Sequence, residues 1–154
     1  MPDLVVVHAS LQNDRDDIWA HTPAAEITQM FPEVAEHYIV RGHNHFAQMR
    51  LWGERQIISA GSAGLPMDSS DTAQYLLLDR KGSAWHATHQ SLCYDHDAAI
   101  TRFHDTNYLQ ETGPMGRLCL RELVTGTAHM VPFLRLYARW RRDGVGLNEA
   151  VERF

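Results

Sequence analysis

The stretch "IVRGHNHF", residues 39–46, decides how the chain is interpreted. It joins a short apolar run to Gly42 and to two histidines, His43 and His45, that lie one residue apart. A glycine lets the backbone turn sharply or approach another group closely. Residues two apart in extended backbone point to the same side, so we expect the two imidazoles to converge on one site. An HxH pair alone does not establish a metal site, because two surface histidines give the same pattern.

A second apolar run ends in a histidine in a similar way. His8 follows the run Leu4–Val7, as His43 follows Ile39–Val40 with two residues between. Continuous β-branched runs are typical of strands in a parallel sheet that is covered on both faces. If these strands are parallel neighbours, His8, His43 and His45 meet at the carboxyl edge of the sheet, where α/β folds bind ligands. Neutral imidazoles on short, rigid backbone are suitable ligands for a catalytic metal ion.

The remaining pattern predicts an α/β layered fold that is β-rich to about residue 92 and helical afterwards. Between the first two strands, Thr22 and Pro23 suit the N-cap and the first position of a short amphipathic helix. The other predicted strands are "FAQMRLWG", "RQIISAG" and the two arms of a hairpin, "AQYLLLDRKG" and "SAWHATHQSL". Helical patterns follow from Asp97 and in "RLCLRELV", "VPFLRLYARWRR" and "LNEAVERF".

The first predicted strand lacks a neighbour on one side in the sequence. Buried parallel strands are usually flanked by other strands on both edges, yet no strand-forming run precedes Leu4–Val7. An apolar strand with an open edge recruits a partner or aggregates. We therefore expect the chain to assemble, either as a homo-oligomer or with a complementary N-terminal half.

Composition excludes several classes of function. The 154 residues are 44% hydrophobic and 21% charged, which suits an ordinary soluble domain. A net charge of −5 gives no general basic field for nucleic acid, and no apolar run approaches the roughly 18 residues that cross a membrane. Cys93 and Cys119 have no CxxC spacing, which predicts neither a disulfide framework nor a zinc-thiolate site. We expect a cytoplasmic protein without membrane contact.

The order of these segments resembles the C-terminal half of the calcineurin-like metallophosphoesterases. The chain has "VVVHAS", "YIVRGHNHF", "QIISAGSAGLPMD" and "AQYLLLD" in succession. The family has a strand ending in His-Gly, then Gly-His-x-His, then an Asn-Pro-Gly-Ser-x-Gly turn, then a tyrosine-rich strand. The resemblance implies a layered α-β-β-α sandwich, of which residues 1–112 form the C-terminal portion. Residues 113–154 form a helical tail that matches nothing in the family.

The resemblance also implies a dinuclear metal centre and a substrate class. His8 and His43 would bind one metal ion and His45 the other, the ions being divalent transition metals such as manganese, iron, zinc or nickel. Two such cations about 3.5–4 Å apart lower the pKa of a bound water and offset charge on phosphate oxygens. The implied activity is that of a phosphatase or phosphodiesterase acting on a phosphate-ester substrate. Asn44 fills the variable position of the motif and is expected to face solvent.

The N-terminal motifs of the family, DxH, GDxxD and GNHD, are absent from the chain. In the family they supply the bridging aspartate, the asparagine ligand and the histidine that protonates the leaving group. Within the matching half, His-Gly has become His8-Ala9 and Asn-Pro has become Ser59-Ala60. Two hypotheses remain. The first is the C-terminal portion of a two-metal phosphoesterase, completed by a missing segment or a separate chain. The alternative is a non-catalytic module that serves as an interaction or oligomerisation unit.

Overall fold

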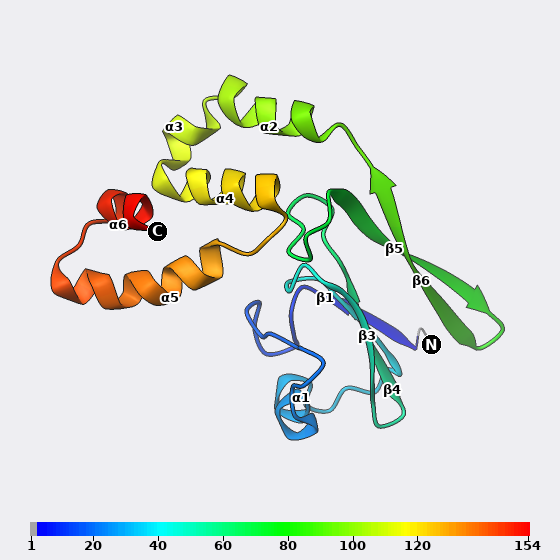
Figure 1. Ribbon diagram of the computed structural model, residues 1–154. Coiled ribbons are helices and arrows are strands. Elements are labelled where there is room, and N and C mark those ends of the chain that lie inside the picture. The colour runs from blue at the N-terminus through cyan, green and yellow to red at the C-terminus, as the bar shows by residue number, and fades with distance from the viewer. Residues whose placement is uncertain (1–2) are drawn as a thin grey trace. The chain divides into compact units, whose positions relative to one another are not determined.

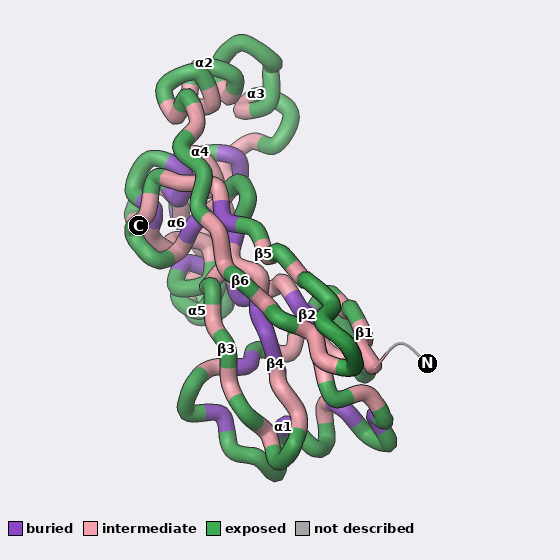
Figure 2. The backbone as a smooth tube through the Cα atoms, turned by 90° about the vertical axis from the view of Figure 1, so that its right-hand side faces the viewer, coloured by how far each residue is buried: buried purple, intermediate pink, exposed green. Residues whose placement is uncertain are grey.

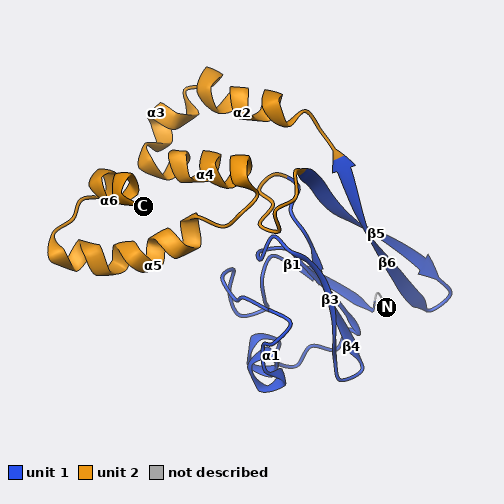
Figure 3. Cartoon of the chain, in the orientation of Figure 1, with its two compact units in different colours: residues 1–63, 72–92 blue, residues 64–71, 93–154 orange. Residues whose placement is uncertain are grey.

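The computed structural model describes residues 3–154 (Figure 1). The chain forms two compact units, and each is described by itself (Figure 3). Unit 1 comprises residues 1–63 and 72–92, and unit 2 comprises residues 64–71 and 93–154. The two units are defined by packing alone and do not test where the family resemblance ends. The boundary between residues 112 and 113 therefore stays a prediction.

Unit 1 contains a four-stranded sheet in the order β1-β2-β4-β3. β1 (Leu4–Val7) pairs in parallel with β2 (Tyr38–Arg41), and β2 pairs in parallel with β4 (Arg55–Ala60). β3 (Ala47–Trp52) joins the other edge of β4 in the antiparallel direction. The predicted strands and the parallel pairing of the first two are therefore confirmed. Figure 2 shows a continuous buried stretch along β4, the strand that has partners on both sides.

One face of this sheet is covered by α1 (Ala24–Met30). Ile27 of the helix and the adjoining Phe31 pack with Ile39 of β2 and Ile57 of β4, and all four side chains are buried. These positions follow the helical spacing on α1 and the alternation of the strands. The helix begins one position away from the prediction because Pro23 occupies the N-cap.

Thr22 was predicted to cap this helix, and that prediction is wrong. Its hydroxyl accepts a hydrogen bond of 2.8 Å from the backbone N–H of Trp19 instead. The backbone N–H of Thr22 donates to the carbonyl oxygen of Trp19 at 3.1 Å, so the two residues close a small turn. A short polar side chain competes for local backbone groups in this way wherever a turn precedes a helix.

A second sheet lies on the face of the four-stranded sheet opposite α1 (Figure 1). It is the predicted hairpin of β5 (Thr72–Lys81) and β6 (Ala84–Cys93), which turns at Gly82 with φ +63°. The two sheets and α1 give the layered α/β architecture that the sequence predicted. Within residues 3–154, no helix combines the length and the apolar character that crossing a membrane requires.

β1 is an edge strand, with a strand partner on the β2 side only among residues 3–154. Val5 and Val7 pack against the core beneath α1. Val6 points to the other face and is 65% exposed. The prediction that Leu4–Val7 is buried on both faces is therefore wrong for this chain, because Val6 is open although Val40 and Ile58, its neighbours across the strands, are buried.

Unit 2 is helical from residue 96 onward, as the sequence predicted. Its helices are α2 (His96–Asp105), α3 (Tyr108–Thr112), α4 (Pro114–Thr125), α5 (Met130–Trp140), the 3-10 turn Arg141–Asp143 and α6 (Leu147–Arg153). Leu118, Phe133 and Ala150 form its buried core. The Glu122 carboxylate accepts from the backbone N–H groups of His129 and Met130 at 2.8 and 2.7 Å, which holds the start of α5. The five-residue α3 was not predicted, since it is too short to show a periodic pattern.

Candidate metal centre

The parallel pairing of β1 and β2 places His8 and His43 side by side at the carboxyl edge of the sheet. Nε2 of His8 lies 3.1 Å from Nδ1 of His43, and the two rings meet edge to face at 75°. The backbone N–H of Gly42 donates to the carbonyl oxygen of His8 at 3.0 Å, which ties the two loops together. The structure therefore brings together two of the three predicted ligands, from segments far apart in the sequence.

The loop that carries His43 and His45 is not extended. Both residues have positive φ, +60° and +58°, in the left-handed region that non-glycine residues seldom adopt. The backbone N–H of Asn44 donates to the carbonyl oxygen of Gly42 at 2.8 Å, which tightens the turn. The premise of an extended HxH pair is thus wrong. His45 is half-buried in this loop, and its role as a ligand stays a prediction.

Two left-handed residues so close together cost roughly 1–3 kcal/mol each, and they persist only where the surroundings hold them. Here the surroundings include the side chain of Arg41, which is only 1% exposed although it is charged. Its Nε donates to the carbonyl oxygen of Ala9 at 2.7 Å, its Nη1 to Oδ1 of Asn44 at 2.5 Å, and its Nη2 to the carbonyl oxygen of Asp16. Burial lowers the pKa of Arg41 to about 10, while Asp17 and Asp16 oppose that shift, so the guanidinium stays charged at neutral pH.

Asn44 is buried, with 5% of its surface exposed, so the expectation that it faces solvent is wrong. Its Oδ1 accepts from Arg41 and, at 3.3 Å, from the backbone N–H of Ile18. Its Nδ2 donates to Oδ1 of Asp17 at 3.0 Å. The variable position of the motif is therefore used in this chain to join the histidine loop to residues 16–18.

Asp17 is a functional candidate that the sequence did not indicate. Its Oδ1 lies 3.6 Å from Nε2 of His43, on the side of the ring opposite His8. Burial lowers the pKa of His43 below its ordinary value, Asp17 and a backbone hydrogen bond with Arg15 oppose that shift, and His8 and Arg41 add to it. A neutral imidazole is the form that binds a metal ion.

The described residues do not form a complete metal site. Across residues 3–154, no three side chains of His, Cys, Asp or Glu come together in a way that could hold a metal ion. The histidine pair alone is therefore not a metal site, and its role in binding a metal ion stays a prediction.

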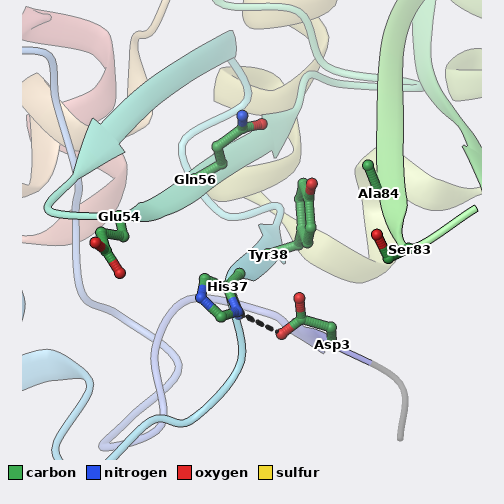
Figure 4. A pocket seen from close by; sticks show the side chains of 7 residues that line it. All are labelled: Asp3, His37, Tyr38, Glu54, Gln56, Ser83 and Ala84. Atoms are coloured by element: carbon green, nitrogen blue, oxygen red, sulfur yellow. Dashed lines mark hydrogen bonds and ion pairs between the residues drawn. The ribbon is translucent and has the colours of Figure 1, made fainter.

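A polar pocket of about 280 Å³ lies at the opposite ends of the same strands (Figure 4). Oδ1 of Asp3 accepts from both the backbone N–H and the Nδ1 of His37, at 2.9 and 2.8 Å. The hydrogen bonds from His37 lower the pKa of Asp3. The backbone N–H of Tyr38 also donates to the carbonyl oxygen of Asp3 at 3.1 Å. Because the Asp3 carboxylate and the His37 imidazole form a hydrogen bond with each other, we interpret this pair as a structural link between the starts of β1 and β2.

Comparison with known proteins supports the fold. No protein-family model matches the chain, and no curated protein matches its sequence. The hypothetical protein PH1004 from Pyrococcus horikoshii is 15% identical with a TM-score of 0.60, over 82% of this chain and 47% of that protein. A metallophosphoesterase from Sphaerobacter thermophilus is 19% identical with a TM-score of 0.55, over 82% of this chain and 57% of that enzyme. The chain thus spans about half the length of the solved structures it matches, and its fold is consistent with the metallophosphoesterase sandwich.

Proposed function

We propose that the chain is the C-terminal portion of a metal-dependent phosphoesterase that hydrolyses phosphate esters at a dinuclear metal centre. The observation that carries this proposal is the contact between His8 and His43 at the carboxyl edge of two parallel strands. Ligands of α/β folds bind at this edge. The similarity in fold to a metallophosphoesterase adds to it.

The histidine pair fits one divalent transition ion. Two nitrogens that each lie about 2.1 Å from the same tetrahedral ion are about 3.4 Å apart. Nε2 of His8 and Nδ1 of His43 lie 3.1 Å apart, at hydrogen-bond distance, so a small movement that breaks this contact would let both bind one ion. In the proposal these two side chains bind one ion and His45 binds the second. Zinc, manganese, iron and nickel all accept imidazole. When bound, such a pair of ions lowers the pKa of a water molecule and offsets negative charge on the phosphate oxygens.

The remaining ligands of the proposed centre come from a complementary polypeptide. The free edge of β1 offers it a place, because a strand added there would end beside His8. Val6, 65% exposed, supplies apolar surface for the same contact. We propose the complementary N-terminal half of a phosphoesterase as the partner at this edge, with a second copy of the chain as the competing occupant.

The alternative function is that of a non-catalytic module that uses the same edge for interaction or oligomerisation. The absence of a three-residue metal cluster within residues 3–154 favours this alternative. The two proposals differ in what the histidine pair does, because only the phosphoesterase uses it to bind metal.

Calorimetric titration with zinc and with manganese separates the two proposals. We expect the purified chain to bind one ion weakly and His43→Ala to abolish that binding. His21→Ala is the matched control, because His21 is exposed and lies outside the histidine pair. Equal binding by His43→Ala and the unmodified chain, or no binding at all, would support the non-catalytic module.

A further inference from the structure

We infer that Asp17 is a positioning residue for His43, and that Asn44 and Arg41 hold Asp17 in place. The inference deepens the proposed function and rests on it, because it explains how one of the proposed metal ligands is oriented. None of these three side chains is proposed as a metal ligand.

The two ring nitrogens of His43 face different groups. Nδ1 faces Nε2 of His8 at 3.1 Å, and Nε2 faces Oδ1 of Asp17 at 3.6 Å. The backbone of Arg15 also forms a hydrogen bond with the His43 ring. A carboxylate only accepts hydrogen bonds, so Asp17 favours the tautomer of His43 with the proton on Nε2. The lone pair of Nδ1 then points to the side where His8 lies. At 3.6 Å the contact with Asp17 is electrostatic and longer than a hydrogen bond.

Asn44 fixes the position of the Asp17 carboxylate. Oδ1 of Asn44 accepts from Nη1 of Arg41 and from the backbone N–H of Ile18. With two donors on its oxygen side, the amide must present its Nδ2 to Asp17, to which it donates at 3.0 Å. Asn44 is buried, so water does not compete for its amide, whereas the Asp17 side chain is 46% exposed.

Arg41 joins the three segments that carry the site. Its guanidinium binds the carbonyl oxygen of Ala9, next to His8, the carbonyl oxygen of Asp16, next to Asp17, and the side chain of Asn44, next to His43. The planar guanidinium presents its donors in a fixed geometry, which suits it to hold several acceptors at once. A shift of any one segment would therefore break a hydrogen bond of the buried Arg41 guanidinium.

The loop that carries Asp17 is also held by its own hydrogen bonds. The carboxylate of Asp16 accepts from the hydroxyl of Ser10 at 2.6 Å and from Nδ2 of Asn13 at 2.9 Å. Oδ1 of Asn13 accepts from the backbone N–H of Arg15 at 2.8 Å. Asp17 thus extends from a rigid turn. Carboxylates that orient a metal-binding histidine typically change metal affinity by 10–100-fold when they are replaced.

The first test reads the tautomer of His43 directly in the metal-free chain. Nitrogen-15 NMR of the imidazoles at about pH 8, above the ordinary histidine pKa of about 6.5, distinguishes a proton on Nε2 from a proton on Nδ1. The signals of His43 are assigned by their loss in His43→Gln. We expect the proton on Nε2 in the unmodified chain. In Asp17→Asn we expect a mixture of tautomers, because the amide of asparagine can donate a hydrogen bond as well as accept one and so does not favour a single tautomer.

The matched control is Asp14→Asn, which removes a nearby exposed carboxylate that forms an ion pair with Arg15 at 3.6 Å. It should leave the tautomer of His43 unchanged. A proton on Nδ1 of His43 in the unmodified chain would overturn the inference. So would an Nε2 proton that persists unchanged in Asp17→Asn, because the carboxylate would then have no part in orienting the ring.

The second test measures zinc affinity in the same variants. Asp17→Asn should weaken binding by about 10–100-fold, and Asp14→Asn should not. Unchanged zinc affinity in Asp17→Asn would contradict the inference even if the tautomer shifts. If no variant binds zinc while the tautomer behaves as expected, the proposed function fails and the positioning of His43 by Asp17 stands.

Discussion

The Nε of Arg41 donates a hydrogen bond of 2.7 Å to the carbonyl oxygen of Ala9, so a side chain from the end of β2 holds the residue that follows His8. The bond crosses from one parallel strand to its neighbour at the edge where the histidines meet. A buried charge is stable only when its donors are satisfied. The position of His8 and the stability of unit 1 therefore depend on the same guanidinium.

Replacing Arg41 with leucine should lower the free energy of unfolding by at least about 1–3 kcal/mol, the cost of leaving one buried acceptor without its donor. The substitution removes the donor from the carbonyl oxygens of Ala9 and Asp16 and from Oδ1 of Asn44, and of these residues Ala9 and Asn44 are buried. Urea denaturation followed by circular dichroism measures the change. Arg139→Leu, at an exposed position of α5, should change stability by no more than about 0.5 kcal/mol. Equal effects of the two substitutions would mean that the buried hydrogen bonds of Arg41 make no net contribution to the free energy of unfolding.

Gly61 should be far less tolerant of alanine than Gly53, although both have positive φ, +91° and +59°. A Cβ at Gly61 would lie 2.2 Å from Oε1 and 2.8 Å from Cβ of Gln74, whereas a Cβ at Gly53 meets nothing within 4 Å. Gly53→Ala should cost about 1–2 kcal/mol, the penalty of the left-handed conformation. Gly61→Ala should cost more, because Gln74 must also move away from its bond to the backbone N–H of Ser62. Thermal melts of the two variants make the comparison, and equal losses would contradict it.

Replacing Asp3 with asparagine should reduce stability at neutral pH, with an effect that fades in acid. The folded-state pKa of Asp3 is lowered from 3.8 by its hydrogen bonds from His37. The stabilisation is therefore fully present above the unfolded-state pKa and is lost as the pH falls through the lowered folded-state pKa. Urea midpoints of the two proteins should differ near pH 7 and converge once the pH is below that folded-state pKa. Asp79→Asn, an exposed position on β5, is the control, and a difference that persists in acid would exclude the ionic origin.

The purified chain should hydrolyse an aryl phosphodiester at close to the background rate. It lacks the DxH, GDxxD and GNHD motifs, and residues 3–154 contain no three-ligand metal cluster. A steady-state assay with added manganese measures this. Turnover at ordinary enzymic rates of roughly 1–10³ s⁻¹, abolished by His43→Ala, would show that the chain needs no complement.

Association through the edge of β1 should be sensitive to a charge at Val6. Full burial of a valine side chain contributes about 1.5–3 kcal/mol, and Val6 is 65% exposed beside the free edge. We expect the chain to associate in light scattering after size exclusion, and Val6→Lys to shift it toward the monomer. Leu51→Lys, at a position 69% exposed on β3, is the control for added charge. A monomer that persists over about a hundredfold range of concentration would contradict the prediction.

The strands, the helical second half and the meeting of two strand-end histidines were predictable because they follow from local pattern. β-branched runs define β1, β2 and β4, and their order places His8 and His43 at one edge. Exposure of Val6 was not predictable in the same way, because it is 65% exposed while Val40, its partner on β2 with an equally apolar side chain, is buried.

The contacts that shape the site were hidden from the sequence for a physical reason. Arg41 binds Ala9 and Asp16, and Asn44 binds Asp17, across gaps of 25 to 32 positions along the chain. Nothing in the local pattern around an arginine or an asparagine distinguishes such a buried role from an exposed one. The positive φ of His43 and His45 was also missed, because the apolar run before them predicted extended backbone.

The parallel pairing of β1 with β2 also determines when the histidine pair can form during folding. β3 and β4 are joined by a tight turn at Gly53, so their pairing is local. Leu4 must pair with Tyr38 across the whole segment that contains α1. Non-local pairings carry a larger loop-closure entropy and form late. The docking of β1 is therefore a late event, and the ring of His8 reaches His43 only when it is complete. A nascent or partly opened chain would hold all of its histidines and still have no paired imidazoles.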